Sequence, residues 1–289
     1  MCFGILSLED EHEDERGKGS SVKKDMEPFP YRRYRPSLVN QQFWSDRFVL
    51  FVEGITAVFD GFKALDIDAF GIEHGEIRVI IGPNGAGKTT FVDVVTGKTQ
   101  PTTGQVYFDG EEITPLLETE IASRGVGRKF QTPTVFDSLT TFENMELALP
   151  GRKRAYADLL AKVSLEERER IDSTLERVNL LDVRDQEAKY LSHGQRQWLA
   201  ISALMISDPK LLLVDEPAAG LTDSETSLTA DLLKELSENH TIVVVEHDMD
   251  FVRQLESRVT VLNEGKIMAE GSLDEIKKND DVIEAYLGR

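Results

Sequence analysis

Cysteine is almost absent from this chain, and other absences narrow the possibilities further. Cys2 is the single cysteine among 289 residues, so no disulfide can form within the chain, as is usual in a reducing compartment. No apolar run approaches the roughly 18 residues that a membrane-spanning helix needs. The apolar opening, residues 1–6, is too short for a signal peptide and is followed at once by an acidic block at 9–15. These absences predict a cytoplasmic protein that acts at a membrane only through partners.

Basic residues are scarce relative to acidic ones. The chain has 33 lysines and arginines against 52 aspartates and glutamates, which gives a formal net charge of −19. Because nucleic-acid phosphates require a basic surface, we expect no nucleic-acid partner. Hydrophobic residues make up 40% of the chain, enough for a sizeable core in one large domain or two small ones.

The first 46 residues differ in composition from the rest of the chain. A like-charge block at 9–15 and a polar glycine-containing stretch at 16–21 are typical of disordered chain. A basic and aromatic patch at 31–36 is interpreted as solvated, and the alternative is a contact with an acidic partner or with lipid headgroups. The composition therefore predicts a charged, disordered tail over residues 1–46 and a folded unit over residues 47–289.

A glycine-rich segment early in the folded part carries the clearest functional signal. It follows a β-branched run at Ile77–Ile81, typical of a buried strand, and leads into a helix-like stretch at 91–95. In this context G-x-x-x-x-G-K-[ST] binds phosphate, because the glycines leave backbone N–H groups accessible at a helix N-terminus. The segment consists of Gly82, Pro83, Asn84, Gly85, Ala86, Gly87, Lys88, Thr89 and Thr90.

Two side chains of this segment have predicted roles. Lys88 is expected to contact the β- and γ-phosphates, and the Thr89 hydroxyl is expected to bind Mg²⁺. The alternative is an ordinary glycine turn before a helix, which would bind nothing. We predict that the protein binds a nucleoside triphosphate.

Apolar blocks separated by helix-like segments indicate an α/β fold. Strands are predicted over 48–52, 65–70, 77–81, 105–108, 211–216 and 241–246, with a late hairpin over 258–270. Strands that run as apolar blocks and alternate with helices predict a mainly parallel sheet covered on both faces. Between about 138 and 200 the periodicity is helical throughout, which predicts an inserted helical subdomain.

Polar side chains follow two of the predicted strands. Asp215 and Glu216 end an apolar block, and the carboxyl end of a parallel strand is where α/β sheets bind ligands. Asp215 is predicted to hold Mg²⁺ and Glu216 to act as general base toward the attacking water. His247 follows the next predicted strand and could donate to a γ-phosphate, although a histidine in such a place is more often structural.

Two further places are candidates for nucleotide contacts. Phe59 lies a short way before the glycine-rich segment and could stack on an adenine ring; the alternative is that Phe59 and Phe62 are both core residues. Ser192 is a natural N-cap for the helix predicted to begin there, and Gly194 leaves backbone amides accessible. The Ser192 turn is therefore a candidate anion site.

Taken together and in this order, the motifs resemble the ATP-binding subunits of ABC transporters over residues 48–289. The matching positions are the phosphate loop at 82–90, the Q-loop glutamine Gln131, the signature at 191–195, the acids Asp215 and Glu216, the switch histidine His247 and the A-loop aromatic Phe59. The resemblance implies a P-loop ABC ATPase fold: a mainly parallel sheet core, an antiparallel β part and an inserted helical subdomain. It implies ATP and Mg²⁺ as cofactors, with Gln131 as a metal ligand beside Thr89 and Asp215.

The resemblance also implies partners. Two such subunits would enclose two ATP molecules, with Ser192, Gly194 and Gln195 contacting a γ-phosphate across the interface. The protein would act with two membrane permease subunits, a second ATPase subunit and, indirectly, a periplasmic solute-binding protein. It would lie in the cytoplasm against the inner face of the cell membrane.

Some stretches narrow the resemblance to one group of transporters. Residues 127–136 and 215–222 are similar to importers of branched-chain amino acids and urea. Residues 191–195, together with Trp198 and the ending 285–289, are most similar to the urea transporter's ATP-binding subunit. Import of urea or short amides is the main prediction and a branched-chain amino acid importer the alternative. A non-transport ABC ATPase is an alternative of another class. Two departures stand out: His193 replaces the usual signature glycine, and Thr222 stands where most ABC proteins have an aspartate.

Overall fold

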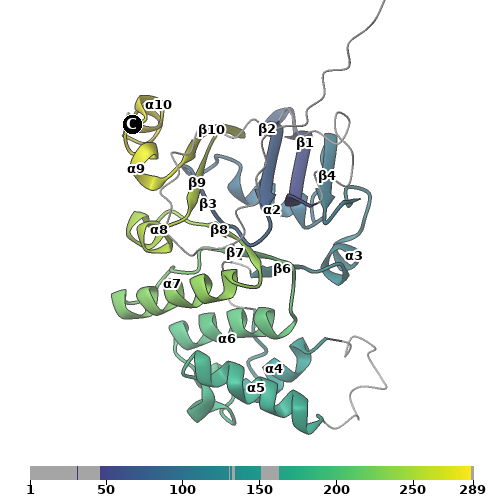
Figure 1. Ribbon diagram of the computed structural model, residues 1–289, viewed down its shortest axis with the longest axis vertical. Coiled ribbons are helices and arrows are strands. Elements are labelled where there is room, and N and C mark those ends of the chain that lie inside the picture. The colour runs from purple at the N-terminus through teal and green to yellow at the C-terminus, as the bar shows by residue number, and fades with distance from the viewer. Residues whose placement is uncertain (1–30, 32–45, 130, 132–133, 151–162, 288–289) are drawn as a thin grey trace, which may run out of the picture.

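The computed structural model describes residues 31, 46–129, 131, 134–150 and 163–287, which form two sheets with helices around them (Figure 1). The first sheet is four-stranded and antiparallel, in the order β2 (Phe62–Glu73), β1 (Phe48–Phe59), β4 (Thr103–Phe108) and β5 (Glu111–Glu112). The second is six-stranded, in the order β10 (Lys266–Gly271), β9 (Arg258–Asn263), β3 (Ile77–Ile81), β8 (Thr241–Val245), β7 (Leu211–Asp215) and β6 (Val126–Lys129). This arrangement confirms the predicted mainly parallel sheet with an antiparallel β part.

The six-stranded sheet is parallel except at one edge. β3 pairs in parallel with β8 and β9, β7 pairs in parallel with β6 and β8, and β10 runs antiparallel to β9. Every residue of β7 and β8 is buried. Neighbouring residues of β3 belong to different clusters: Ile80 packs toward the antiparallel sheet, whereas Val79 and Ile81 pack toward the helices of the other face. The apolar blocks of the sequence are thus explained by burial on both faces.

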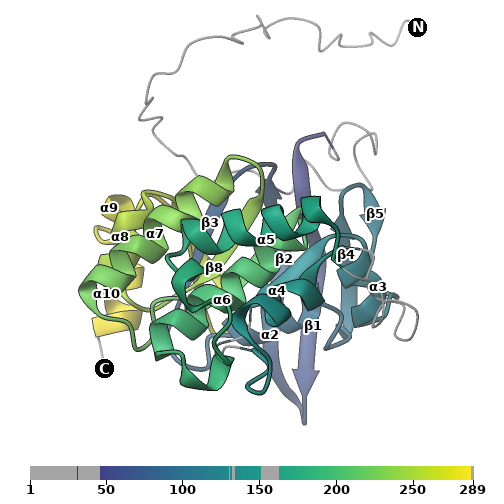
Figure 2. The ribbon, with the colours of Figure 1, turned by 90° about the horizontal axis from the view of Figure 1, so that it is seen from below.

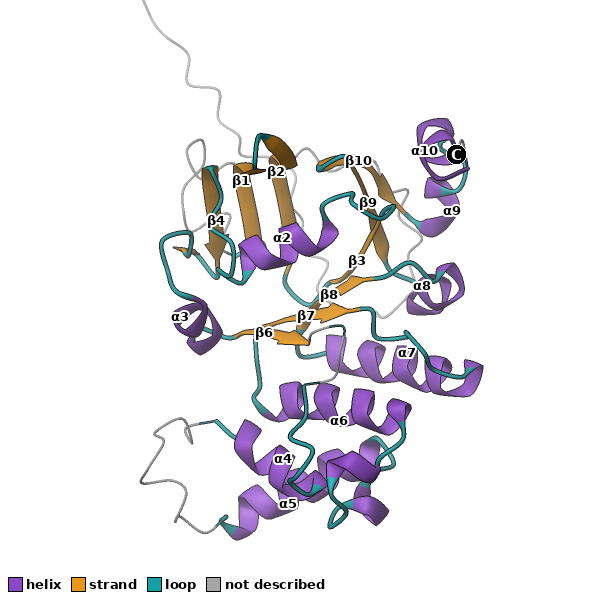
Figure 3. Ribbon diagram, turned by 180° about the vertical axis from the view of Figure 1, so that it is seen from behind, coloured by secondary structure: helices purple, strands orange, loops and turns teal. Residues whose placement is uncertain are grey.

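Helices cover the parallel sheet on both sides (Figure 3). α2 (Lys88–Val95) packs in the apolar cluster between the two sheets. α6 (His193–Ile206), α7 (Asp223–Ser237) and α8 (Met249–Leu255) cover the opposite face. The remaining helices are α3 (Glu118–Ser123), α4 (Thr141–Ala148), α5 (Leu165–Arg177), α9 (Leu273–Ile276) and α10 (Asp280–Leu287), with short 3₁₀ turns at Leu181–Val183 and Ala188–Tyr190. Seen from below, α4, α5 and α6 lie together in front of the sheet (Figure 2).

Several helices begin at a capping box that the sequence supplies. In each, a Ser or Thr side chain accepts a hydrogen bond from the amide three residues on, and a Glu or Gln there bonds back to the cap amide. The capping residues are Thr140, Ser164, Ser192, Thr222 and Ser272. The prediction that Ser192 caps a helix is confirmed. None of the helices within the described ranges is long and apolar enough to cross a membrane.

Two local predictions were wrong. β1 and β2 extend beyond the predicted strands at 48–52 and 65–70, and they form one hairpin whose two-residue turn is Asp60 and Gly61. Both turn residues have positive φ angles, 49° and 83°, as the tight turn between twisted strands requires. β6 was not predicted at all, because only four residues form it and two of them are charged.

Tyr31 is buried, so the interpretation of the patch at 31–36 as solvated is wrong for this residue. Its side chain is 5% exposed. The ring packs against Phe48 and Phe70, with centroid distances of 6.1 and 5.6 Å. The remainder of the predicted tail, apart from residue 46, lies outside the described residues. One aromatic residue of the N-terminal segment therefore belongs to the core between the antiparallel sheet and α2.

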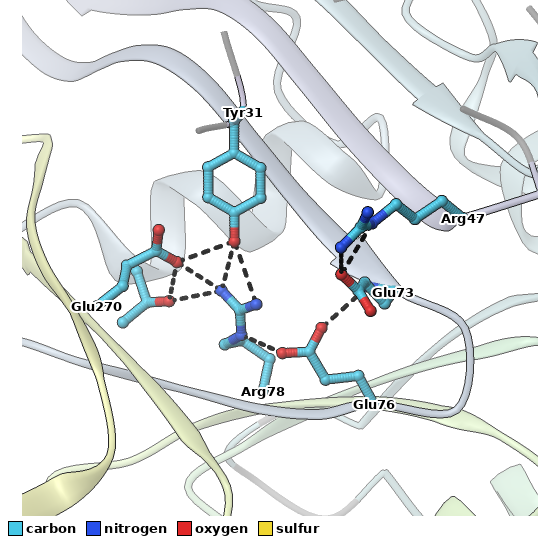
Figure 4. A network of polar contacts seen from close by, with 7 residues as sticks. Tyr31, Arg47, Glu73, Glu76, Arg78 and Glu270 are labelled. Carbon is cyan, nitrogen blue, oxygen red and sulfur yellow. Dashed lines mark hydrogen bonds and ion pairs between the residues drawn. The ribbon is translucent and has the colours of Figure 1, made fainter. Parts of the chain in front are cut away.

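The Tyr31 hydroxyl takes part in a buried polar network around Arg78 (Figure 4). Arg78 has no exposed surface, and its Nη1 and Nη2 both donate to the Tyr31 hydroxyl at 3.2 Å. Arg78 also donates to Glu76 and Glu270, each at 2.6 Å, and to the Thr260 hydroxyl at 3.0 Å. Burial raises the pKa of Tyr31, so its hydroxyl stays protonated and donates to Glu270. Two carboxylates and one phenol thus satisfy a cation that would otherwise be costly to bury.

Candidate nucleotide site

The glycine-rich segment 82–90 connects β3 to α2, as the sequence predicts. Gly87 precedes the helix with a φ of 100°, and a Cβ at this position would lie 2.6 Å from the Ala64 carbonyl oxygen. A Cβ on Gly82 would lie 2.3 Å from the carbonyl oxygen of Leu262. Because neither position has room for a side chain, the loop backbone stays tight against β2 and β9. The first amides of α2 have no acceptor within the helix and remain available to an anion.

Lys88 folds back over this loop. Its Nζ donates to the carbonyl oxygens of Gly82 at 2.7 Å and Pro83 at 3.1 Å. Burial lowers the pKa of Lys88, and the nearby carboxylates of Glu216 and Asp215 oppose that shift. The predicted lysine therefore lies within electrostatic reach of both predicted acids. Thr89 is exposed in the first turn of α2.

The two acids lie where β7 ends. Asp215 is 9% exposed, and burial raises its pKa, whereas Arg128 is the main influence that lowers it. Glu216 has a φ of 44°, so the backbone leaves the sheet abruptly after Asp215, and its amide donates to the Val245 carbonyl oxygen at 2.9 Å. A left-handed conformation at a non-glycine residue costs about 1–3 kcal/mol and is typical of functional sites.

Gln131 and His247 both lie next to Glu216. Gln131 Nε2 donates a hydrogen bond to Glu216 Oε2. His247 Nδ1 lies 3.6 Å from Glu216 Oε1, and the imidazole is 64% exposed. The structure thus brings four predicted site residues close to the carboxylate of Glu216: Lys88, Gln131, Asp215 and His247.

Glu246 holds this region together, and sequence reasoning missed it. It is 1% exposed, and its Oε1 accepts from the Ala218 amide at 3.1 Å. Its Oε2 accepts from the amides of His247 at 2.8 Å and Asp248 at 3.1 Å. The carboxylate therefore fixes the turn after Glu216 to the turn that carries His247. The only sequence signal was an acid that ends an apolar run, which was taken as part of the strand.

A second missed residue lies beneath the acids. Lys129, the last residue of β6, is 3% exposed and donates to the Asp215 carbonyl oxygen at 3.4 Å. Burial lowers the pKa of Lys129 to about 8, with Asp215, Glu246 and Glu216 opposing the shift. A buried lysine thus lies next to a cluster of three carboxylates.

The signature turn is shaped by its own cap. Ser192 Oγ accepts from the Gln195 amide at 3.2 Å, and Gln195 Oε1 accepts from the Ser192 amide at 2.9 Å. Within the described residues, these two side chains form hydrogen bonds with each other's backbone amides and not with the loop 82–90. Ser192 and Gln195 are both outside the cluster around Glu216.

The two residues between them contact the segment that follows β7. His193 Nε2 donates to the Ala219 carbonyl oxygen at 3.1 Å. A Cβ on Gly194 would lie 2.3 Å from Glu225 Oε1, so α6 and the first turn of α7 approach closely there. The departure at His193 therefore makes a contact that a glycine could not make, and it joins the signature turn to the turn after Glu216.

Phe59 lies at the tip of the β1–β2 hairpin. Its side chain is 46% exposed and that of Phe62 is 64% exposed, so the alternative that both are core residues is wrong. No contact recorded within the described ranges joins Phe59 to the phosphate loop. β2 itself passes that loop, because the Ala64 carbonyl oxygen lies against Gly87.

The donors predicted to bind a metal ion suit Mg²⁺. Thr89, Gln131 and Asp215 offer hydroxyl, amide and carboxylate oxygens, the hard ligands that Mg²⁺ prefers. Within the described residues there is no group of three or more His, Cys, Asp or Glu side chains that could hold a metal ion. A single buried carboxylate fits an ion that keeps several waters and takes its other ligands from phosphate.

Comparisons with known proteins agree with this geometry. A family model described as ABC transporter matches residues 65–219, and a model described as branched-chain amino acid ATP-binding cassette transporter matches residues 266–289. The high-affinity branched-chain amino acid transport ATP-binding protein BraF of Pseudomonas aeruginosa is 37% identical over 251 residues, covering 83% of this chain and 98% of that protein. LivG of Escherichia coli strain K12, which has the same description, is 36% identical over 249 residues with the same coverage.

The chain also resembles solved structures of ATP-binding cassettes. A nucleotide-free ATP-binding cassette from an ABC transporter superposes with a TM-score of 0.72 at 30% identity, covering 84% of this chain and all of that one. The ADP conformation of the cassette MJ1267 gives 0.71 at 31% identity, covering 84% of this chain and 99% of that one. The dimeric cassette MJ0796, bound to ADP and phosphate, gives 0.68 at 29% identity, covering 78% of this chain and 98% of that one.

Fold and site together define a P-loop ATPase of the ATP-binding cassette type, an enzyme that binds and hydrolyses ATP. The chain belongs to the ABC transporter family and, within it, to the group of branched-chain amino acid transport ATP-binding proteins that includes BraF and LivG. Cassettes of this family form dimers and work with permease subunits.

Proposed function

We propose that this chain drives the import of a branched-chain amino acid through two membrane permease subunits. One observation carries the assignment: transport proteins with that solute in their description match this chain over 98% of their own length. The separate match of residues 266–289 to the group's own family model supports it. The alternative solute of the sequence analysis is thereby favoured over urea.

Urea, or a short amide, is the second candidate solute. The observation that favours it is the signature at 191–195, with His193 in place of the usual glycine, together with the ending 285–289. The His193 contact with Ala219 gives this departure a physical role in the fold. The solute itself would touch the permease and the binding protein, so the ATPase alone distinguishes the two candidates only through resemblance.

The proposed hydrolysis uses the residues gathered around Glu216. The loop 82–90 would bind the triphosphate through its amides and Lys88, and Phe59 would stack on the adenine. Glu216 would accept a proton from the attacking water, and His247 would donate to the γ-phosphate. Thr89, Gln131 and Asp215 would hold Mg²⁺, which when bound neutralises charge on the phosphates.

A second ATPase subunit, identical or not, would complete each site. Ser192, Gly194 and Gln195 would contact the γ-phosphate bound by the partner, and the likeness to a dimeric cassette supports this arrangement. Residues 47–289 are the proposed ATP-binding domain, and its helical part at about 138–200 would dock the permease at the inner face of the cell membrane through the region near 131–143. Residues 1–46 are the proposed N-terminal tail, of which Tyr31 packs into the core of that domain. A periplasmic binding protein would deliver the solute.

The solute assignment is tested by uptake in cells that lack this gene. We expect labelled leucine uptake at micromolar supply to be lost and labelled urea uptake to be normal. Complementation with the parent gene should restore uptake, and complementation with Lys88→Ala should not. Loss of urea uptake with normal leucine uptake would move the assignment to the second candidate. Normal uptake of both solutes would contradict both.

A further inference from the structure

We propose that Arg128 is a positioning residue that sets the distance between the phosphate-loop helix and the strand end carrying Asp215. The proposal rests on the proposed nucleotide and metal roles of Thr89 and Asp215. The stretch around Arg128 resembles importers in sequence, but the sequence predicts no role for Arg128 itself.

The geometry places one guanidinium between two carboxylates from different elements. Arg128 lies on β6, the edge strand next to β7, and its side chain is 7% exposed. Its Nη1 donates to Asp93 Oδ1 on α2 at 2.5 Å. Its Nη2 lies 3.9 Å from Asp215 Oδ2 at the end of β7. A weaker contact of 3.5 Å joins Nη1 to the Thr96 hydroxyl just after α2.

Asp93 is well placed to transmit this contact to the site. Thr89 and Asp93 are four residues apart in the same helix, so their side chains share one face of α2. Fixing Asp93 therefore fixes the rotation of α2 and with it the direction in which the Thr89 hydroxyl points. Through its other nitrogen the same arginine lies beside Asp215. Two of the proposed metal ligands, Thr89 and Asp215, thus have one common anchor.

The chemistry of arginine suits this role better than that of lysine. A planar guanidinium holds its N–H groups in a fixed geometry and can donate to two carboxylates at once. An ammonium acts instead as a point charge. Removing Arg128 would leave Asp215 and Asp93 as like charges below the surface. Asp93 would keep one partner, Lys98, whose Nζ lies 3.4 Å away. The expected effect is therefore a loosened metal site and not a collapse of the helix.

The test separates metal-dependent from metal-free nucleotide binding. A fluorescent ATP analogue is titrated into parent, Arg128→Gln and Arg128→Lys, with EDTA and with increasing Mg²⁺, and the Mg²⁺ dependence of hydrolysis is measured alongside. Residues that orient metal ligands typically contribute 10–100-fold to metal affinity. We expect Arg128→Gln to raise the half-maximal Mg²⁺ concentration about tenfold or more. Affinity in EDTA should stay within about twofold, and Arg128→Lys should recover part of the loss.

Two further variants keep the result interpretable. Asp93→Asn removes the negative charge from the helix side of the same ion pair and should shift the Mg²⁺ dependence in the same direction, which covers the case in which Arg128→Gln does not fold. Arg184→Gln breaks a more exposed ion pair, to Asp172 at 2.7 Å in the helical part, and should leave Mg²⁺ dependence unchanged. An unchanged Mg²⁺ dependence in both Arg128→Gln and Asp93→Asn would overturn the proposal, as would an equal loss of affinity in EDTA. A parent protein without Mg²⁺-dependent binding would instead overturn the proposed metal site.

Discussion

Single buried charges hold the junctions of this protein together. Glu246 joins the turns after β7 and β8, Arg128 contacts α2 beside the end of β7, and Arg78 joins β3 to Glu270 on β10 and to Tyr31. In each case the charged side chain joins segments that are far apart in sequence. Because a buried charge that loses one partner keeps its full desolvation cost, these junctions should be sensitive to small changes.

Tyr31→Phe tests the junction at Arg78. The substitution keeps the ring but removes the hydroxyl that accepts from Arg78 Nη2 and donates to Glu270. Leaving buried groups without that partner costs about 1–3 kcal/mol. Each kcal/mol lowers the melting temperature of a protein of this size by about 2–4 °C, which thermal unfolding followed by circular dichroism would detect.

The matched control for this substitution is Tyr107→Phe. Its hydroxyl bonds to the exposed Gln105 at 2.9 Å, so its loss should cost less than about 0.5 kcal/mol. A Tyr31→Phe protein that melts at the same temperature as the control would mean that the Tyr31 hydroxyl adds nothing to the stability of this junction.

Among the elements, the β1–β2 hairpin offers a direct test of the proposed contact between Phe59 and adenine. Phe59 and Phe62 flank the same two-residue turn and are both exposed. Base stacking on an aromatic ring is worth about 1–3 kcal/mol, so Phe59→Ala should weaken ATP binding about tenfold. Phe62→Ala, which removes an equal ring from the same hairpin, should leave the affinity within about twofold. Equal losses in an equilibrium titration would rule out a specific role for Phe59.

The sequence predicted those elements whose signal is local. Apolar blocks identified β7 and β8 because both strands are buried along their whole length. The glycine-rich segment between two apolar runs predicted the turn from β3 into α2, and the structure confirms that turn. Ser192 identified the start of α6 because the cap and its partner Gln195 are three residues apart.

The parts that sequence missed depend on distant partners. β6 carries Arg128 and Lys129, charges that argue against a buried strand until the carboxylates of Asp93 and Asp215 are placed beside it. Tyr31 lies in a polar stretch without periodicity, and its burial follows from the positions of Arg78, Phe48 and Phe70. No local pattern in the sequence predicts these contacts.

In the whole molecule, the proposed hydrolysis site at Glu216 and the signature turn at 191–195 are connected by contacts within one chain. The turn that carries Glu216 is bonded through Ala219 to His193 at the start of α6, and α6 packs in the same apolar cluster as α4 and α5. A change at Glu216 can therefore be transmitted within one chain to the signature turn and to the helical part. ATP can shift the transporter between states only through contacts that differ between them, and the paired site would supply such contacts.

The Glu216→Gln substitution tests whether Glu216 is the general base for ATP hydrolysis. Glutamine keeps the size and hydrogen bonding of the side chain but cannot accept a proton from water. General-base catalysis contributes about 10²–10⁴-fold, so hydrolysis should fall by that factor. ATP affinity should be retained, because Lys88 and the loop amides are unchanged. Lys88→Ala should instead lose ATP binding.

The decisive measurement is the single-turnover rate of ATP cleavage by Glu216→Gln beside the parent, with ATP affinity measured on the same preparations. We expect Glu216→Gln to bind ATP as tightly as the parent and to cleave it at least about a hundredfold more slowly. Cleavage of ATP by Glu216→Gln at the parent rate would show that Glu216 is not the general base.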